Sequence, residues 1–157
     1  MMYQKIAIAI LLLCSQVLPA NASNNSELTT DDLHVVVATA KTWKGTPYRY
    51  GGKDKSGIDC SHFVYSVYNR VFEGISYRVA EDFPRSADFN RTQSPHVGDT
   101  IYFPGVNGAS AHVGILTDVE SRKFIGAQSS TGVKEASYAK GSYWGKRPYQ
   151  ILSLLSK

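Results

Sequence analysis

The stretch GIDCSHFVYSVYNRVF (residues 57–72) decides the fold that we expect for this chain. Its apolar side chains recur at intervals of three and four residues, as they do on one face of an α-helix. We therefore predict a helix that begins at or just after Cys60 and ends near Gly74. The unpaired backbone amides at the start of a helix favour a thiolate, so this position suits a reactive cysteine. The apolar positions are Phe63, Val64, Val67, Tyr68 and Val71.

Another helix is predicted on the N-terminal side, over residues 31–44, because apolar residues again follow helical spacing there. The Gly- and Pro-rich segment between the two helices, residues 45–57, is expected to be a loop. Residues 76–95 carry many charges and show little periodicity, so we expect a second loop with one short helical turn around residues 84–89.

Beyond Gly98 the sequence changes to short runs that are typical of β-strands and are separated by turn residues. Helices followed by an antiparallel sheet define an α+β fold, with N-terminal helices packed on a central antiparallel sheet. The predicted strands are Thr100–Phe103, Ala111–Thr117, Lys123–Gln128, Val133–Ser137 and Tyr149–Leu155.

The first 22 residues have the pattern of a cleaved signal peptide. Lys5 precedes an apolar run over residues 6–13, and Ala20-Asn21-Ala22 offers small residues at the cleavage site. The apolar run is too short to span a bilayer, which needs about 20 residues. Cleavage after Ala22 would remove Cys14, so the exported protein is expected to keep one cysteine. The short, weakly charged start favours the periplasm.

The exported chain is expected to consist of a flexible leader, residues 23–30, and one domain, residues 31–157. The sequence has 17 basic and 13 acidic side chains, and only Lys5 lies in the predicted signal peptide. This mild positive charge is scattered, so it gives little support to nucleic-acid binding. It suits a polyanionic neighbour such as a cell-wall polymer, although an ordinary solvated surface would look the same.

A lone cysteine in an exported protein has three interpretations. Exported proteins use cysteines mostly in pairs, and an unpaired thiol indicates either an intermolecular link or a reactive group. Alternatively, Cys60 is a small buried hydrophobic residue. No cluster has the spacing of zinc ligands, so we expect no metal and no cofactor.

A reactive thiol needs a base, and the exported chain offers four histidines. His34 on the first helix and His96 in a loop are most simply surface residues. His62 is two residues from Cys60, and such neighbours point apart on a helix. His112 lies in the most strand-like segment, so a rigid element presents its ring, although many strand histidines are only structural. It shares one strand face with Gly114 and Leu116, whereas Ala111, Val113 and Ile115 occupy the other.

A third group normally orients the imidazole by accepting a hydrogen bond from its second nitrogen. The next predicted strand places Phe124, Gly126 and Gln128 on one face. Gln128 is the strongly polar side chain among them, and its amide oxygen could accept that bond. An equally good interpretation is that Gln128 bonds to backbone or water at the end of the strand.

Five separated blocks, in the same order, resemble the NlpC-type cell-wall peptidases, which are papain-like cysteine enzymes that cleave the peptide part of bacterial peptidoglycan. They are spread over most of the exported chain, from residue 45 to residue 152, which makes the resemblance specific. The blocks are GTPYRYGGKDKSGIDCSHFVYSVY (45–68), VGDTIYF (97–103), AHVGIL (111–116), FIGAQSSTGV (124–133) and YWGKRPYQIL (143–152).

The resemblance implies a papain-like fold in which Cys60 is the nucleophile and His112 the general base. It also implies that the hydroxyl of Tyr48 lines the site, and that Asp59 and Ser61 help to hold polar groups of the substrate. From the residues alone, Tyr48 could instead be a packing aromatic, and Asp59 and Ser61 could cap the helix.

Two positions depart from the family pattern. His62 stands where a small residue, usually glycine, follows the Asp-Cys-Ser motif, and its ring could narrow the cleft, contact substrate or point to solvent. Gly126 stands at the position where the third catalytic residue is commonly histidine. Gln128 lies two residues further on the same face, so we predict that it takes this role.

The resemblance implies acyl transfer by a secreted cysteine peptidase that acts on peptidoglycan stem peptides, most simply at the bond between D-glutamate and the following diamino acid. Two other functions remain open at this point. One is a non-catalytic wall-binding module on the same scaffold, and the other is an antibacterial or phage-type amidase that acts on foreign walls.

Overall fold

The computed structural model describes residues 29–154. The predicted signal peptide and all but the last two residues of the predicted leader lie outside the described residues. Thr30, which the sequence pattern assigns to the leader, is the first residue of helix α1. No helix within the described part of the chain is long and apolar enough to cross a membrane.

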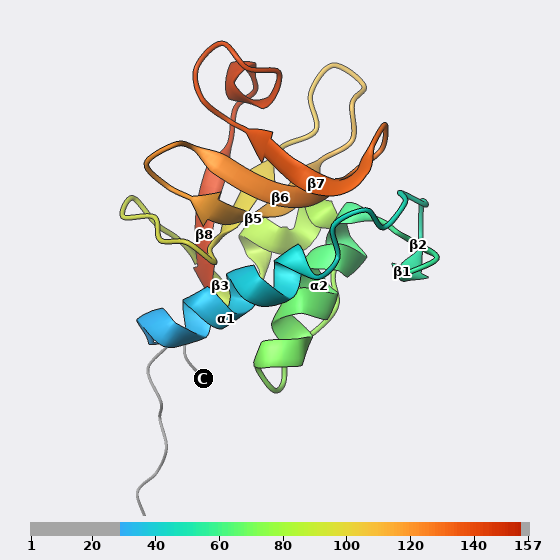
Figure 1. The fold of residues 1–157 in the computed structure, drawn as a ribbon. Helices are drawn as coiled ribbons and strands as arrows, with labels where there is room; N and C mark the ends of the chain where they lie inside the picture. The colour runs from blue at the N-terminus through green and yellow to red at the C-terminus, as the bar shows by residue number, and fades with distance from the viewer. Residues whose placement is uncertain (1–28, 155–157) are drawn as a thin grey trace, which may run out of the picture.

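The centre of the molecule is a six-stranded sheet in the order β3-β8-β4-β5-β6-β7, and every neighbouring pair is antiparallel. The helices α1 (Thr30–Lys41) and α2 (Cys60–Val71) lie together beside this sheet (Figure 1). The predicted α+β class is therefore confirmed. The strands of the sheet are β3 (Phe89–Arg91), β4 (Thr100–Phe103), β5 (His112–Asp118), β6 (Lys123–Gln128), β7 (Gly132–Ser137) and β8 (Gln150–Leu154).

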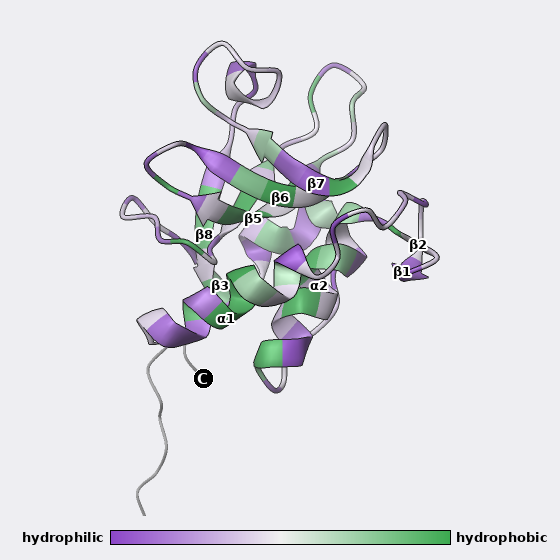
Figure 2. Ribbon diagram, in the orientation of Figure 1, coloured by the Kyte–Doolittle hydropathy of each residue, from purple (hydrophilic) through white to green (hydrophobic). Residues whose placement is uncertain are grey.

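The sheet separates two hydrophobic clusters. On the helical side, Val113 and Ile115 of β5 pack with the apolar faces of α1 and α2. On the other side, Leu116 and Phe124 pack with Trp144, which comes from the connection between β7 and β8. Hydrophobic residues concentrate on the helices and the middle strands (Figure 2). The alternation of faces predicted for β5 is thus confirmed, and it decides on which side of the sheet His112 projects.

Several local predictions were wrong. The segment 45–57 contains a short hairpin, β1 (Lys53–Asp54) and β2 (Gly57–Ile58), rather than loop alone. The helical turn of the second loop is the 3₁₀ helix η1 (Ala80–Arg85), which lies earlier than expected, and β3 follows it. The partner of β3 is β8, about sixty residues away, so no local pattern could reveal the pairing.

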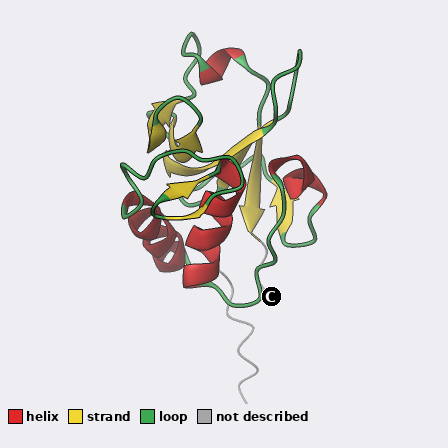
Figure 3. Ribbon diagram, turned by 90° about the vertical axis from the view of Figure 1, so that its right-hand side faces the viewer, coloured by secondary structure: helices red, strands yellow, loops and turns green. Residues whose placement is uncertain are grey.

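Two further differences concern the end of α1 and a short helix that the sequence did not indicate. Helix α1 stops at Lys41 instead of Lys44, because Thr42 caps it. A short 3₁₀ helix, η2 (Trp144–Lys146), precedes β8 and was not expected. Figure 3 shows η2 at the top of the molecule, well away from α1 and α2. This distant element brings side chains to the site described next.

Candidate active site

Cys60 is the first residue of α2, and the carboxylate of Asp59 caps the helix. The Asp59 carboxylate accepts hydrogen bonds from the backbone N–H groups of His62 (2.8 Å) and Gly51 (3.0 Å), and from the hydroxyl of Ser61 (2.8 Å). Burial works against the charge, but the bonds from His62 and Ser61 hold the pKa of Asp59 below its ordinary value. One carboxylate therefore fixes the preceding loop and the start of the helix together.

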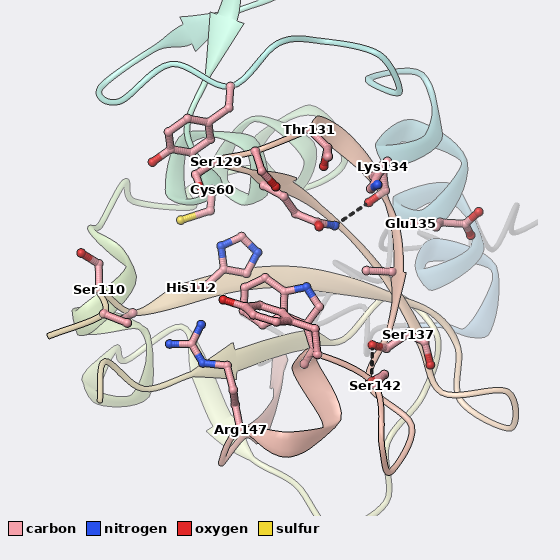
Figure 4. Close-up of a pocket in the computed structure, with 18 residues that line it drawn as sticks. Cys60, Ser110, His112, Ser129, Thr131, Lys134, Glu135, Ser137, Ser142 and Arg147 are labelled. Carbon is pink, nitrogen blue, oxygen red and sulfur yellow. Dashed lines mark hydrogen bonds between the residues drawn. The ribbon is translucent and has the colours of Figure 1, made fainter. Parts of the chain in front are cut away.

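His112 begins β5, and its ring stacks on Trp144 with centroids 4.5 Å apart and an interplanar angle of 21°. The sulfur of Cys60 and the imidazole of His112 lie next to each other and line the same pocket of about 770 Å³ (Figure 4). Tyr48 and Gln128 also line this pocket. The fold thus brings together Cys60, His112, Tyr48 and Gln128, which are far apart in the sequence.

The thiol is less acidic than its place at the start of a helix predicts. Burial raises the pKa of Cys60 to about 11, although the backbone N–H groups of Val113 and Ser61 near the sulfur act in the opposite direction. The helix start is therefore not enough to ionise the cysteine, because the loss of hydration outweighs it. At neutral pH the sulfur rests as a neutral thiol.

The imidazole is neutral as well. Burial, helped by the nearby charge of Arg147, lowers the pKa of His112 to about 3. A neutral imidazole opposite a neutral thiol can accept the proton of that thiol when the sulfur attacks. Such an arrangement can transfer the proton by general-base catalysis and does not require a resting ion pair.

The second nitrogen of the ring is unpaired among the described residues. Nε2 of His112 is buried without a hydrogen bond to any of them, and a Cβ atom on Gly126 would lie only 3.2 Å from it. Gln128 lies at the same edge of the sheet, but its amide nitrogen donates to the carbonyl oxygen of Lys134 (3.3 Å). In this structure Gln128 does not bond to the imidazole, so its orienting role stays a prediction.

His62 does not line the pocket. Its Nδ1 lies 3.1 Å from both carboxylate oxygens of Asp59. Its ring stacks on the ring of Tyr77, with the two ring centroids 4.1 Å apart. The hydroxyl groups of Ser61 and Tyr77 are 3.3 Å apart. Asp59 and Ser61 are buried and do not line the described pocket, so their contact with substrate also stays a prediction.

Sequence reasoning missed Trp144 and Arg147, which both line the pocket. The guanidinium carbon of Arg147 lies 5.2 Å from the centre of the Trp144 ring. Both belong to the block YWGKRPYQIL, which carries part of the family resemblance, but nothing local indicates that it packs beside His112. Within the described chain, no group of three or more His, Cys, Asp or Glu residues could hold a metal ion.

Relatives found by comparison with known proteins are named as endopeptidases. A probable endopeptidase of Haemophilus influenzae is 33% identical over 113 residues, which are 69% of this chain and 66% of the relative. The murein DD-endopeptidase MepS/murein LD-carboxypeptidase of Escherichia coli K12 is 33% identical over 122 residues, covering 73% of this chain and 59% of the relative. The chain thus spans two thirds or less of the length of these relatives.

Solved structures and family models agree with these relatives. The crystal structure of the NlpC/p60 domain of the peptidoglycan hydrolase SagA matches with a TM-score of 0.57 at 32% identity, covering 76% of this chain and 97% of that domain. The model of the NlpC/P60 family matches residues 45–153, which include Cys60 and His112. This chain therefore belongs to the NlpC/P60 family.

Proposed function

We propose that the protein is a cysteine peptidase that hydrolyses amide bonds in the stem peptides of peptidoglycan. The observation that carries the proposal is the Cys60 sulfur at the start of α2, which lies beside the buried imidazole of His112 in the same pocket. Relatives named as endopeptidases support it. The predicted signal peptide supports action outside the cytoplasm, in the cell envelope.

The reaction would proceed by acyl transfer. His112 takes the proton of Cys60 while the sulfur attacks the amide carbonyl carbon, and backbone N–H groups near the sulfur, such as that of Val113, stabilise the negative charge. The imidazolium then gives its proton to the leaving amine. Water, deprotonated by His112, hydrolyses the thioester and restores the thiol. Since Nε2 points at Gly126, Nδ1 is the nitrogen that serves the thiol.

The stack on Trp144 fixes the plane of the imidazole during these proton transfers. Such a contact can partly replace a hydrogen-bonding third residue, because it restricts rotation of the ring. It offers no acceptor for Nε2, however. Stabilisation of the imidazolium would therefore depend on a group that reaches Nε2 during the reaction.

The proposed bond is the one between D-glutamate and the diamino acid of the stem peptide. The experiment is digestion of purified peptidoglycan with the purified protein, followed by mass spectrometry of the released peptides. We expect products that end in D-glutamate and products that begin with the diamino acid. Products that arise only from cleavage at D-alanine in cross-links would overturn the bond assignment but not the hydrolase, whereas no released peptide would overturn both.

The role of Gln128 has its own test. Replacing Gln128 by alanine is expected to lower kcat by more than tenfold if its amide oxygen leaves Lys134 and accepts from Nε2 of His112 in the reaction. Gln150→Ala, a matched substitution on β8 outside the described pocket, is expected to leave kcat unchanged. Steady-state kinetics on a stem peptide measures both, and an unaffected Gln128→Ala enzyme would remove this assignment alone.

A further inference from the structure

Arg147 places a positive charge in the pocket beside the reacting groups. Its side chain is half-buried and lies against Trp144, which in turn stacks on His112. Arg147 and His112 line the same pocket (Figure 4). The charge is near enough to contribute to the lowered pKa of that histidine. Arg147 therefore lies within electrostatic reach of the reaction centre.

This guanidinium has no anionic partner within residues 29–154. Four ion pairs are found in that part of the chain, and Arg147 belongs to none of them. The acidic residue that lines the pocket, Glu135, is already bonded to Lys44 at 2.7 Å. Arginine presents a planar fork of donors that matches a carboxylate, and a half-buried guanidinium gains most from such a partner.

The position of Arg147 indicates which half of the substrate would supply that carboxylate. In Figure 4, Cys60 and Arg147 lie on opposite sides of His112. The sulfur bonds to the acyl half of the substrate, while the imidazole delivers its proton to the leaving amine. The leaving half must therefore extend past His112, toward Arg147.

We propose that Arg147 is a specificity residue that binds a carboxylate on the leaving half of the substrate. It thereby selects stem peptides whose diamino acid carries a side-chain carboxylate, as diaminopimelic acid does, over those that carry lysine. The proposal rests on the proposed peptidase function. It adds that Arg147 recognises the diamino acid, and that it does so by binding the side-chain carboxylate of that residue.

The test compares two tetrapeptides, L-Ala-γ-D-Glu-X-D-Ala, in which X is meso-diaminopimelic acid or L-lysine. We expect the purified protein to favour the first in kcat/KM by roughly 10- to 100-fold, the range of one charge-assisted hydrogen-bonded contact. Arg147→Gln is expected to reduce this preference to within about threefold. Arg147→Lys, which keeps the charge but loses the fork, should retain an intermediate preference.

Lys146→Gln is the matched control, because it removes the same charge from the neighbouring, exposed residue outside the pocket. It should keep the full preference. Arg147 also packs on Trp144, so Arg147→Gln could disturb His112 as well. Such a disturbance lowers both rates and cancels in their ratio, and thermal unfolding of each variant checks that it folds.

The outcomes separate this inference from the proposed function. An Arg147→Gln variant that keeps the wild-type preference overturns the inference, and so does a wild-type protein that cleaves both peptides equally well. In either case the peptidase function stands. A wild-type protein that cleaves neither these peptides nor peptidoglycan would overturn the proposed function itself.

Discussion

Replacing Cys60 by alanine is expected to lower peptide release from peptidoglycan by at least about 10⁴-fold, to the background without enzyme. Alanine has no group that can form the acyl intermediate, while the helix cap made by Asp59 stays in place. Mass spectrometry of released peptides, with the wild-type protein and the variant at equal concentrations, measures the effect.

The control for this prediction is stability. Cys60 is a small buried residue without a disulfide partner in the described chain, so its replacement by alanine should change the unfolding free energy only modestly. Equal product from both proteins would refute the thiol mechanism. If neither protein released peptides but both bound peptidoglycan equally, the non-catalytic wall-binding module would be the better description.

Replacing His112 by glutamine is expected to have the second largest effect and to change two measurements. The loss of the general base should lower kcat by about 10³-fold. It should also remove a pH dependence of stability. Burial lowers the pKa of His112 from 6.5 to about 3. Between these two pH values the unfolded chain binds a proton at His112, whereas the folded protein does not.

The direction of the pH dependence follows from this difference between the pKa values of the folded and the unfolded protein. Neutral His112 contributes its full stability above about pH 6.5, and the contribution is lost as the pH falls toward 3. At pH 4 the wild-type protein should therefore have lost about 3 kcal/mol that the His112→Gln variant does not lose. Urea unfolding of both proteins at pH 7 and at pH 4 measures the four free energies of unfolding that this comparison needs.

Other groups also titrate in this range, but they do so in both proteins, so the difference between wild type and variant isolates His112. His34→Gln is the matched control, because it removes an exposed histidine from α1. It should show the wild-type loss between pH 7 and pH 4. An identical pH dependence in wild type and His112→Gln would contradict the burial of a neutral imidazole.

Much of the fold was predictable because its signals are local. The spacing of apolar residues predicted α2 and its start at Cys60, and alternation predicted β5 with His112 and Leu116 on the same face. Periodicity of this kind follows from backbone geometry, which each short segment carries by itself. The pair Cys60 and His112 can therefore be selected from local pattern alone.

The surroundings of that pair could not be predicted in the same way. The charge states are one example, since the helix start suggested an acidic thiol, whereas burial makes Cys60 less acidic. Burial depends on which distant segments cover a residue, and no short sequence window contains that information. The same holds for His62, whose ring is engaged by Asp59 and Tyr77 instead of reaching the cleft.

The sequence by itself determined the helix that presents the thiol, the strand that presents the imidazole and the family to which the chain belongs. Only the tertiary structure decided that Trp144 stacks on His112, that Gln128 bonds to Lys134, and that Arg147 faces the pocket without a carboxylate partner in the described chain. The physical reason is that the positions of Trp144 and Arg147 depend on how the segment before β8 packs against β5, and that the choice of partner for Gln128 depends on the side-chain geometry of the β6–β7 hairpin, so no local pattern contains this information.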